Sequence, residues 1–352
     1  MKVLFLTVDD ETRASSRTRV FQFLPYLKDN GIQYDIVAWN GKVFRPRNPV
    51  LKLLLGEIFN YFVMTAKITW ALLKIKAYDV VFVQKITLMR LLWLLRALKI
   101  KYVYDIDDAI YTLHSAELAK AKQPVRVNAA IEYMKSARHM IVELPSTEEV
   151  AKQNCANVTT ILGPIDTHRY HPSSKEGRNT VTIGWIGSLS NTFYLFDVQI
   201  ALENLCGKYP DLRIDLVGTR GFATKEKNIS LIEWKLNTEL HELAKFDIGI
   251  MPLTDDEWSR GKGSYKLLQY MALGIPAVAS PVGINTTLVK DGETGFLAST
   301  NKDWEEKLSV LIENPSLREQ MGKKARNLAV QNYSLDAAAI KFVSAIKQAA
   351  NA

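Results

Sequence analysis

The sequence predicts an α/β protein that consists of two doubly wound domains. Short apolar runs alternate with longer helical patterns through both halves of the chain, and this alternation is typical of parallel strands buried between layers of helices. The length of 352 residues also exceeds what a single core usually organises. Because doubly wound sheets bind ligands beyond the carboxyl ends of their strands, we expect the chemistry in the loops that follow the strands.

The apolar runs mark the strands. In the first half we expect strands at Val3–Val8, Tyr34–Ala38, Val80–Gln84, Tyr102–Asp105, His139–Val142 and Thr159–Ile161. In the second half we expect them at Thr182–Ile186, Arg213–Val217, Ile229–Ile232, Ile248–Met251, Ala277–Ala279 and Gly295–Leu297. Helical patterns cover Tyr265–Leu273 and Ser334–Ala349, where Ser334 serves as N-cap.

A polar segment without periodicity, Asp166–Thr180, separates the two halves. Such segments are typical of interdomain linkers. We therefore expect an N-terminal domain over residues 1–170 and a C-terminal domain over residues 171–334. The last helix, residues 335–352, is expected to pack back on the N-terminal domain.

The composition indicates a globular protein with an anionic partner. Hydrophobic residues make up 47% and charged residues 23% of the chain, which argues against long disordered regions. The net charge is +8 and the pI about 9.2, and a basic balance suits phosphates, nucleic acid or an acidic membrane, although it also simply solubilises a surface. The two cysteines, Cys155 and Cys206, form neither a disulfide framework nor a zinc pattern.

The N-terminal run is too short for a signal peptide and meets Asp9, Asp10 and Glu11 at once. No run reaches the roughly 18–20 apolar residues of a membrane-spanning helix. We therefore expect a cytoplasmic protein.

The loop before the helix at Tyr265 has the features of a phosphate site. It contains Gly261, Lys262, Gly263 and Ser264. Glycines let backbone amides approach an anion, and the start of a helix adds a favourable dipole. Arg260 and Lys266 bring further positive charge. The spacing matches neither a P-loop nor the GxGxxG pattern, so an ordinary basic loop before a helix is the alternative.

The run from Lys266 to Gly283 (KLLQYMALGIPAVASPVG), with Asp291–Leu297 (DGETGFL) after it, resembles the C-terminal domain of retaining glycosyltransferase family 4. The resemblance implies the GT-B fold, in which two Rossmann-like domains enclose a cleft. It also implies a nucleotide-sugar donor bound mainly by the second domain, and it implies that no metal or other cofactor is needed.

The same resemblance suggests the donor-binding residues. Family members carry two glutamates separated by seven residues, and these positions are Gly261 and Gln269 here. The amide of Gln269 keeps an acceptor for ribose hydroxyls, whereas Asp256 and Glu257 are candidates to replace the glutamate that is missing at Gly261. The other expected donor-site residues are Lys262 and Lys266 at the diphosphate, Trp234 and Lys235 near the base, and Gly187, Gly263, Ser264 and Tyr265 in the surrounding loops.

Three carboxylates, Asp105, Asp107 and Asp108, follow a first-half strand. Carboxylates this close raise one another's pKa or bind a cation, so a metal site, a clamp for sugar hydroxyls and a helix N-cap are all possible interpretations. By resemblance Asp107 falls beside the donor sugar, and we favour that role.

Arginines gather in the loop after the first strand. Arg13, Arg17 and Arg19 there suit phosphate recognition. We favour Arg17, because Arg19 could instead begin the next helix and point to solvent. His114 could reach the same region, but a surface histidine is the alternative.

Residues 42–101 are both basic and strongly apolar. The stretches Leu53–Trp70 and Met89–Lys101 have the composition of helices that lie on anionic membranes. Either stretch could instead be a helix that faces the core of the first domain. Together they favour an attachment to the inner face of the cytoplasmic membrane.

These observations lead to one functional expectation. It is retaining transfer of a hexose or N-acetylhexosamine, with UDP-GalNAc as the expected donor, to a polyprenyl-diphosphate-linked saccharide in O-antigen or other cell-surface polysaccharide synthesis. The alternative is a non-catalytic nucleotide- or glycan-binding protein at the membrane surface. Nucleic acid is not an expected partner.

Overall fold

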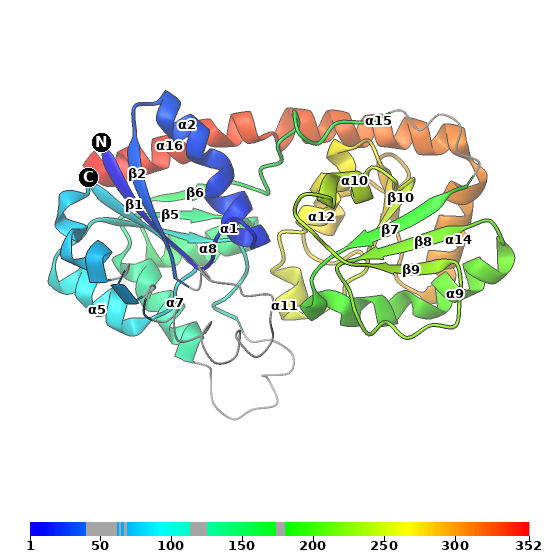
Figure 1. Cartoon of the computed structure of the whole chain (residues 1–352), viewed down its shortest axis with the longest axis horizontal. Helices are drawn as coiled ribbons and strands as arrows, with labels where there is room; N and C mark the ends of the chain where they lie inside the picture. The colour runs from blue at the N-terminus through cyan, green and yellow to red at the C-terminus, as the bar shows by residue number, and fades with distance from the viewer. Residues whose placement is uncertain (40–61, 63–64, 67–68, 113–124, 174–179, 352) are drawn as a thin grey trace. The chain divides into compact units, whose positions relative to one another are not determined.

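The structure is a computed structural model that describes residues 1–39, 62, 65–66, 69–112, 125–173 and 180–351. The chain divides into two compact units (Figure 1). The first comprises Met1–Leu162 together with Asp336–Ala352, and the second comprises Gly163–Leu335. The boundary lies at 162/163 rather than at the expected 170/171, because residues after Gly163 pack on the second unit: Ile165 bridges to Ser334, and Tyr170 bonds to Glu239.

The first unit contains a six-stranded parallel sheet in the order β2-β1-β3-β4-β5-β6. The strands are β1 (Lys2–Thr7), β2 (Gln33–Ala38), β3 (Val80–Gln84), β4 (Tyr102–Ile106), β5 (His139–Val142) and β6 (Val158–Thr160). All six strands are parallel, but the order in which they are added to the sheet reverses at β1: β2 lies on one side of β1 and β3 lies on the other. The carboxyl ends of β1 and β3 are therefore the place where such a sheet binds a ligand.

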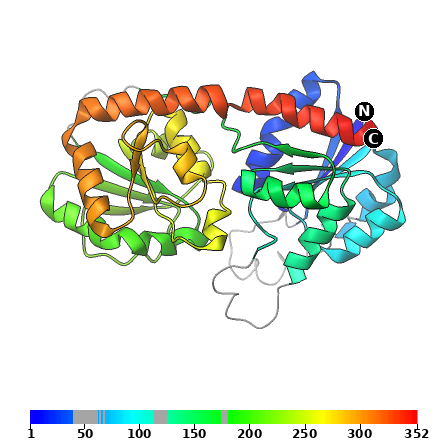
Figure 2. The same cartoon turned by 180° about the vertical axis from the view of Figure 1, so that it is seen from behind.

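Alternate residues of these strands face opposite helical layers, as the two-residue period of a strand requires. Leu4 and Leu6 join one core with residues of α5 (Met89–Ala97) and α7 (Val125–Ser136). On the other face Phe5 and Phe82 pack against Phe342 of the C-terminal helix, and Figure 2 shows this helix along the sheet. The helices are α1 (Ala14–Arg19), α2 (Leu24–Asp29), α5 (Met89–Ala97), α7 (Val125–Ser136), α8 (Pro145–Asn154) and α16 (Leu335–Asn351), with 3₁₀ turns η1 (Phe21–Phe23) and η3 (Ile75–Ala77).

The second unit also contains a six-stranded parallel sheet, in the order β12-β11-β10-β7-β8-β9. Its strands are β7 (Thr182–Ile186), β8 (Arg213–Val217), β9 (Ile229–Ile232), β10 (Ile248–Met251), β11 (Ala277–Ala279) and β12 (Gly295–Leu297). These bounds are the ones predicted from the apolar runs. In the first sheet the predicted β1 and β6 lie one residue too late, the predicted β2 begins one residue too late and the predicted β4 ends one residue too early.

Helices cover both faces of the second sheet. Its helices are α9 (Gln199–Lys208), α10 (Glu239–Leu243), α11 (Glu257–Arg260), α12 (Tyr265–Ala272), α13 (Asn285–Leu288), α14 (Asn301–Glu313) and α15 (Pro315–Asn332), with the 3₁₀ helix η4 (Leu189–Val198). Buried residues of α9 and α14, such as Leu202 and Trp304, pack on one face. The order of the strands reverses between β7 and β10, so the loops after these two strands lie where a ligand is expected.

Candidate functional site

The loop between α11 and α12 follows β10 at this reversal point. Ser264, directly before α12, has a left-handed backbone with φ of 51°, which is uncommon for a residue with a side chain. Its hydroxyl donates to Asn285 Oδ1 at 2.6 Å, and Asn285 Nδ2 donates to the Ser280 carbonyl oxygen at 2.9 Å. Both side chains are buried. The loop is therefore held in a defined conformation that directs the chain into the first turn of α12.

Lys262 precedes that first turn and Lys266 lies within it. The Lys262 ammonium lies 5.7 Å from the ring centroids of both Tyr194 and Trp258. The Lys266 ammonium lies 5.5 Å from the ring centroid of Trp185. Cation–π contacts contribute about 0.5–1 kcal/mol at exposed sites and about 2 kcal/mol where the pair is desolvated. Two cations and the positive end of α12 thus occupy one end of the helix.

Two glycines bring backbone segments together at the carboxyl ends of β7 and β8. Gly218 has φ of +86°, and a Cβ there would lie 2.0 Å from the carbonyl oxygen of Gly187. A Cβ on Gly187 would in turn lie 2.3 Å from the Trp185 ring. Only glycine fits at these two positions. The edge of the sheet at Gly187 therefore exposes backbone rather than a side chain, beside the Trp185 ring that Lys266 contacts.

A buried carboxylate connects three further residues of this edge. Glu239 accepts hydrogen bonds from the Tyr170 hydroxyl at 2.6 Å, from Trp234 Nε1 at 2.8 Å and from Gln269 Nε2 at 3.3 Å. Gln269 also donates to the Tyr170 hydroxyl. The structure thus joins the predicted residues Trp234 and Gln269 through Glu239, which sequence reasoning missed because nothing in its local pattern marks it.

The ribose contact expected of Gln269 stays a prediction, since the amide nitrogen serves this network. Lys235 is exposed and lies 3.8 Å from Glu233.

The two candidates to replace the glutamate missing at Gly261 differ in their environment. Asp256 is the N-cap of α11, because its carboxylate accepts the Ser259 backbone N–H at 2.7 Å. Glu257 occupies the first turn of the same helix. Arg260 pairs with Asp255 at 2.7 Å on the surface. Asp256 thus has a structural role already, and Glu257 is the better remaining candidate.

In the first unit, the interpretation that Arg19 points to solvent is wrong. Arg19 ends α1 and is 2% exposed. Its guanidinium bonds to the Asp105 carboxylate at 2.6 Å and to the Ile161 carbonyl oxygen at 2.8 Å. Arg17, the favoured arginine, is half-buried and donates to the carbonyl oxygen of Glu11 at 3.1 Å.

The other two aspartates share a lysine. The ammonium of Lys85 lies 2.8 Å from Asp107 Oδ1 and also contacts Asp108. Burial would raise the pKa of Asp107, but Lys85 together with Ser15 and Arg19 outweighs it, and the pKa is lowered to about 2. In the structure these carboxylates therefore pair with cationic side chains of the protein. Sequence reasoning missed Lys85, although its place directly after a predicted strand was a usable signal.

A further carboxyl group, Glu143, follows β5 and is 6% exposed. Burial raises its pKa to about 8, and the neighbouring aspartates add to the shift while Arg19 opposes it. Among the described residues, no group of three or more His, Cys, Asp or Glu side chains is arranged to hold a metal ion.

The predicted membrane-binding stretches are only partly described. Residues 42–61, which include much of Leu53–Trp70, and His114 lie outside the described residues. In α5, Leu91, Leu92 and Leu95 belong to the core, so this face follows the core-facing interpretation. Trp93 of the same helix is nevertheless 72% exposed. No helix in the described ranges is long and apolar enough to cross a bilayer.

Comparison with known proteins agrees with this geometry. Residues 166–328 match the family model of glycosyl transferases group 1. The structure of HepE from Anabaena in complex with UDP and glucose is similar, with 15% identity and a TM-score of 0.70 over 99% of both chains. Sucrose-phosphate synthase from Thermosynechococcus elongatus is similar with 12% identity and a TM-score of 0.71, over 99% of this chain and 98% of that one.

One curated relative matches over only part of both chains. Spore coat protein SA of Bacillus subtilis (strain 168) is 19% identical over 218 residues, which are 53% of this chain and 57% of that protein. The chain thus spans about half the length of the curated relative that it matches.

These matches confirm the predicted GT-B fold. Most of the second unit matches a glycosyltransferase family model, in agreement with the resemblance of the run from Lys266 onward, and glycosyl transfer from a nucleotide sugar is the enzyme class that this match indicates.

Proposed function

We propose that the protein transfers a hexose or N-acetylhexosamine from a UDP-sugar, with UDP-GalNAc as the expected donor, and that it retains the anomeric configuration. The proposed acceptor is a polyprenyl-diphosphate-linked saccharide, in the synthesis of O-antigen, lipopolysaccharide or another cell-surface polysaccharide. No metal or other cofactor is part of the proposal.

One observation carries the donor assignment: Lys262 precedes the first turn of α12 and Lys266 lies within it, at the point where the strand order reverses. A departing nucleoside diphosphate gains negative charge in the transition state. Preorganised cations and helix dipoles stabilise such charge more than they stabilise the ground state. Both lysines therefore act on the leaving group, with Gly187, Gly263, Ser264 and Tyr265 around it.

Uridine is the proposed base because HepE, which shares the fold, has been solved with UDP and with UDP-glucose. Trp234 and Lys235 follow β9 at the same edge of the sheet. We propose that they lie near the base and that Gln269 accepts from a ribose hydroxyl. Arg17 of the first unit is proposed to contact phosphate.

The sugar-binding role of Asp107 is also a proposal. Lys85 keeps this carboxylate ionised, since the pKa of Asp107 is about 2. An ionised carboxylate accepts several hydrogen bonds at once, so one lysine leaves capacity for the hydroxyls of a sugar.

The first test is thermal stabilisation by UDP, GDP and a panel of UDP-sugars, with and without magnesium. Ligand at 100 times its dissociation constant stabilises a protein by about 2.7 kcal/mol. We expect stabilisation by UDP that Lys262→Ala weakens and that Lys324→Ala, an exposed lysine of α15, leaves unchanged. Stabilisation by no nucleotide would contradict the donor assignment.

Turnover is measured next, with a lipid-linked saccharide as acceptor. Removal of one group that stabilises a transition-state charge typically costs about 10²–10³ in kcat. Lys266→Ala should therefore lower kcat more than it raises KM. An equal kcat in Lys266→Ala and the unaltered protein would exclude this role for Lys266.

Membrane attachment is tested separately by flotation with vesicles. Leu73, Leu88, Met89 and Trp93 of the first unit are exposed, and exposed apolar side chains beside basic ones bind anionic lipid. We expect binding to vesicles that contain phosphatidylglycerol and less binding for Trp93→Ser, but not for the control Val330→Ser on α15. Equal flotation of all three proteins would remove Trp93 from the proposal.

A further inference from the structure

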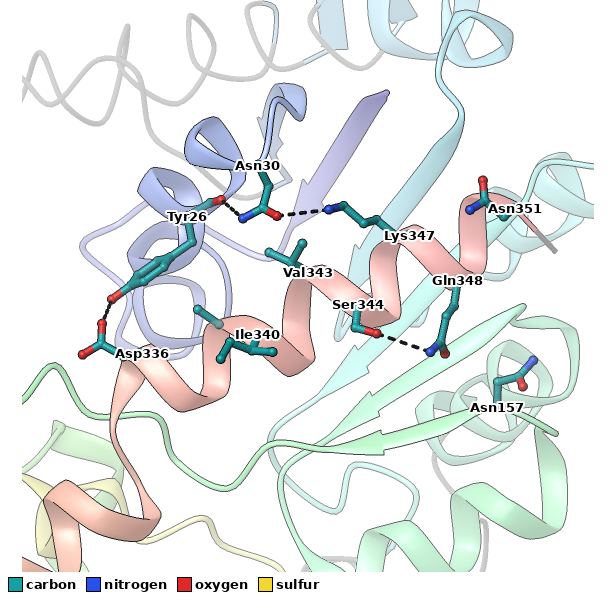
Figure 3. A pocket seen from close by; sticks show the side chains of 11 residues that line it. Tyr26, Asn30, Asn157, Asp336, Ile340, Val343, Ser344, Lys347, Gln348 and Asn351 are labelled. Atoms are coloured by element: carbon teal, nitrogen blue, oxygen red, sulfur yellow. Dashed lines mark hydrogen bonds between the residues drawn. The ribbon is translucent and has the colours of Figure 1, made fainter.

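The first unit has a groove on the outer face of α16, and this groove contains none of the residues assigned to the donor. Its volume is about 850 Å³, within the range of ligand pockets. The floor is one face of α16, from Ala339 to Asn351, and the walls are α2 on one side and Asn157, before β6, on the other (Figure 3). Thirteen helical residues extend about 20 Å at 1.5 Å each, so the groove is elongated.

Carboxamides make up half of the polar side chains that line it. They come from three places, and they are Asn30, Asn157, Gln348 and Asn351. A carboxamide offers both a donor and an acceptor. Asn30 uses both functions within the protein: its amide nitrogen donates to the Tyr26 carbonyl oxygen at 3.0 Å, and its oxygen accepts from Lys347 at 3.0 Å. Gln348 donates to Ser344 at 3.3 Å, so its oxygen can accept from a ligand.

The charges in the groove balance. One cation, Lys347, and one anion, Asp336, line it. Lys347 bonds to Asn30 and Asp336 accepts from the Tyr26 hydroxyl, as Figure 3 shows. The lining residues thus offer an anionic ligand no excess of positive charge. The groove therefore suits an uncharged ligand.

Apolar surface lies between these polar groups. Ile340 on the floor is 74% exposed, whereas Val343, one turn further along α16, is buried. The ring of Tyr26 forms part of the wall. A ligand that fits has hydroxyl groups at its edges, each a donor and an acceptor, and an apolar C–H face. That is the chemistry of a neutral saccharide.

A peptide fits less well. An extended peptide binds by adding a strand to a sheet edge, but the floor here is a helix, whose backbone groups are already paired. A helical peptide needs apolar anchors at intervals of three and four residues, whereas Ile340 is the one strongly exposed aliphatic side chain among the residues that line this groove.

We propose that this groove is a second carbohydrate site, which holds a neutral oligosaccharide of several sugar units away from the donor-binding residues. The proposal does not rest on the proposed transfer reaction. In a glycosyltransferase it would retain a growing glycan near the protein between successive reactions.

The test is calorimetric titration of the full chain with chitotetraose, maltotetraose, N-acetylglucosamine, tetragalacturonic acid and an uncharged nonapeptide. We expect a neutral tetrasaccharide to bind at least about tenfold more tightly than the monosaccharide, because several subsites act together. Binding of the peptide or the anionic tetrasaccharide alone, or of no probe, would overturn the proposal.

Matched variants locate the site. Gln348→Ala with Asn351→Ala should weaken tetrasaccharide binding at least about fivefold, and alanine keeps the exposed helix stable. Gln320→Ala with Asn327→Ala removes two exposed amides from α15 and should change nothing. Equal affinity in both double variants would place the oligosaccharide elsewhere and overturn the assignment.

A third measurement separates this inference from the donor assignment. Stabilisation by UDP should be the same in Gln348→Ala/Asn351→Ala and in the unaltered chain. If UDP fails to stabilise either protein while the tetrasaccharide still binds to the groove, the proposed transfer reaction fails and the carbohydrate site stands.

Discussion

Each unit buries a carboxylate near the carboxyl edge of its sheet, but the two are stabilised in different ways. Asp105 of the first unit is paired with the guanidinium of Arg19. Glu239 of the second unit is held by a hydroxyl, an indole and an amide, from Tyr170, Trp234 and Gln269. The first arrangement neutralises a charge with a charge. The second connects three chain segments through one acceptor.

The difference bears on function. The aspartates of the first unit form ion pairs with Arg19 and Lys85. Much of the charge near this edge of the sheet therefore stabilises the fold. In the second unit, the buried carboxylate positions residues that belong to the proposed donor site, and Lys262 and Lys266 lie over aromatic rings. We infer that the second edge is the better prepared for an anionic ligand.

The largest expected effect comes from removal of the buried arginine. Arg19→Met leaves Asp105 without its partner, and loss of one member of a buried ion pair typically costs about 3–5 kcal/mol. Urea denaturation measures this loss. The exposed pair Arg260–Asp255 provides the control, since Arg260→Ala should cost at most about 1 kcal/mol. Similar losses in both variants would contradict the structural role of the Arg19 pair.

The stability of the protein should depend on pH through Glu143 of the first unit. The pKa of Glu143 rises from 4.5 to about 8 on folding, because the group is buried among aspartates. Between these two values the folded state binds more protons than the unfolded state. The contribution of Glu143 to stability is therefore fully present below about pH 4.5 and is lost as the pH rises through 8. The loss is on the order of a few kcal/mol.

Thermal unfolding from pH 5 to 9 should show this fall in the unaltered chain and a smaller one in Glu143→Gln. Parallel curves for the two proteins would mean that Glu143 is ionised in the folded state.

Substitutions at two glycines test the close backbone approach between Gly218 and Gly187 in the second unit. Gly218 and Gly221 have φ of +86° and +82°, but only Gly218 has close neighbours, since a Cβ there would lie 2.0 Å from the Gly187 oxygen. Gly221→Ala should cost about 1 kcal/mol for its backbone conformation, and Gly218→Ala about 1–3 kcal/mol more. Gly218→Ala should also weaken UDP binding because Gly187 must move. Equal losses of stability would show that the close approach has no energetic cost.

The smallest effect concerns the network around Glu239. Tyr170→Phe removes one hydrogen bond to a buried carboxylate and should cost about 1.5 kcal/mol. Tyr26→Phe removes a hydroxyl that bonds to Asp336 at the surface and should cost less. The Tyr170 variant should also weaken stabilisation by UDP, since α12 loses part of its support. An unchanged response to UDP would separate this network from donor binding.

Much of the fold could be predicted because buried parallel strands have a strong signal. Continuous apolar runs such as Ile248–Met251 mark a strand whatever lies next to it, and the predicted bounds in the second sheet agree with the structure. The domain boundary was harder to predict. A polar composition marks a linker, but the hydrogen bonds of Tyr170 attach its first part to the second unit.

The candidate site divides in the same way. Lys262, Gly263, Ser264 and Lys266 are adjacent in sequence, so their residue types and their position before a helix were sufficient to select them. Arg19 and Asp105 are 86 residues apart, and Tyr170 and Gln269 are 99 apart. No local pattern indicates such partners.

The sequence by itself determined the two parallel sheets, their strands and the basic turn before α12, because periodicity, composition and capping act over a few neighbouring residues. Only the tertiary structure decided which charges are already paired, that Glu239 joins Trp234 to Gln269, and that α16 carries an amide-lined groove. These features depend on segments that are distant along the chain and come together only when the sheet and its helices pack.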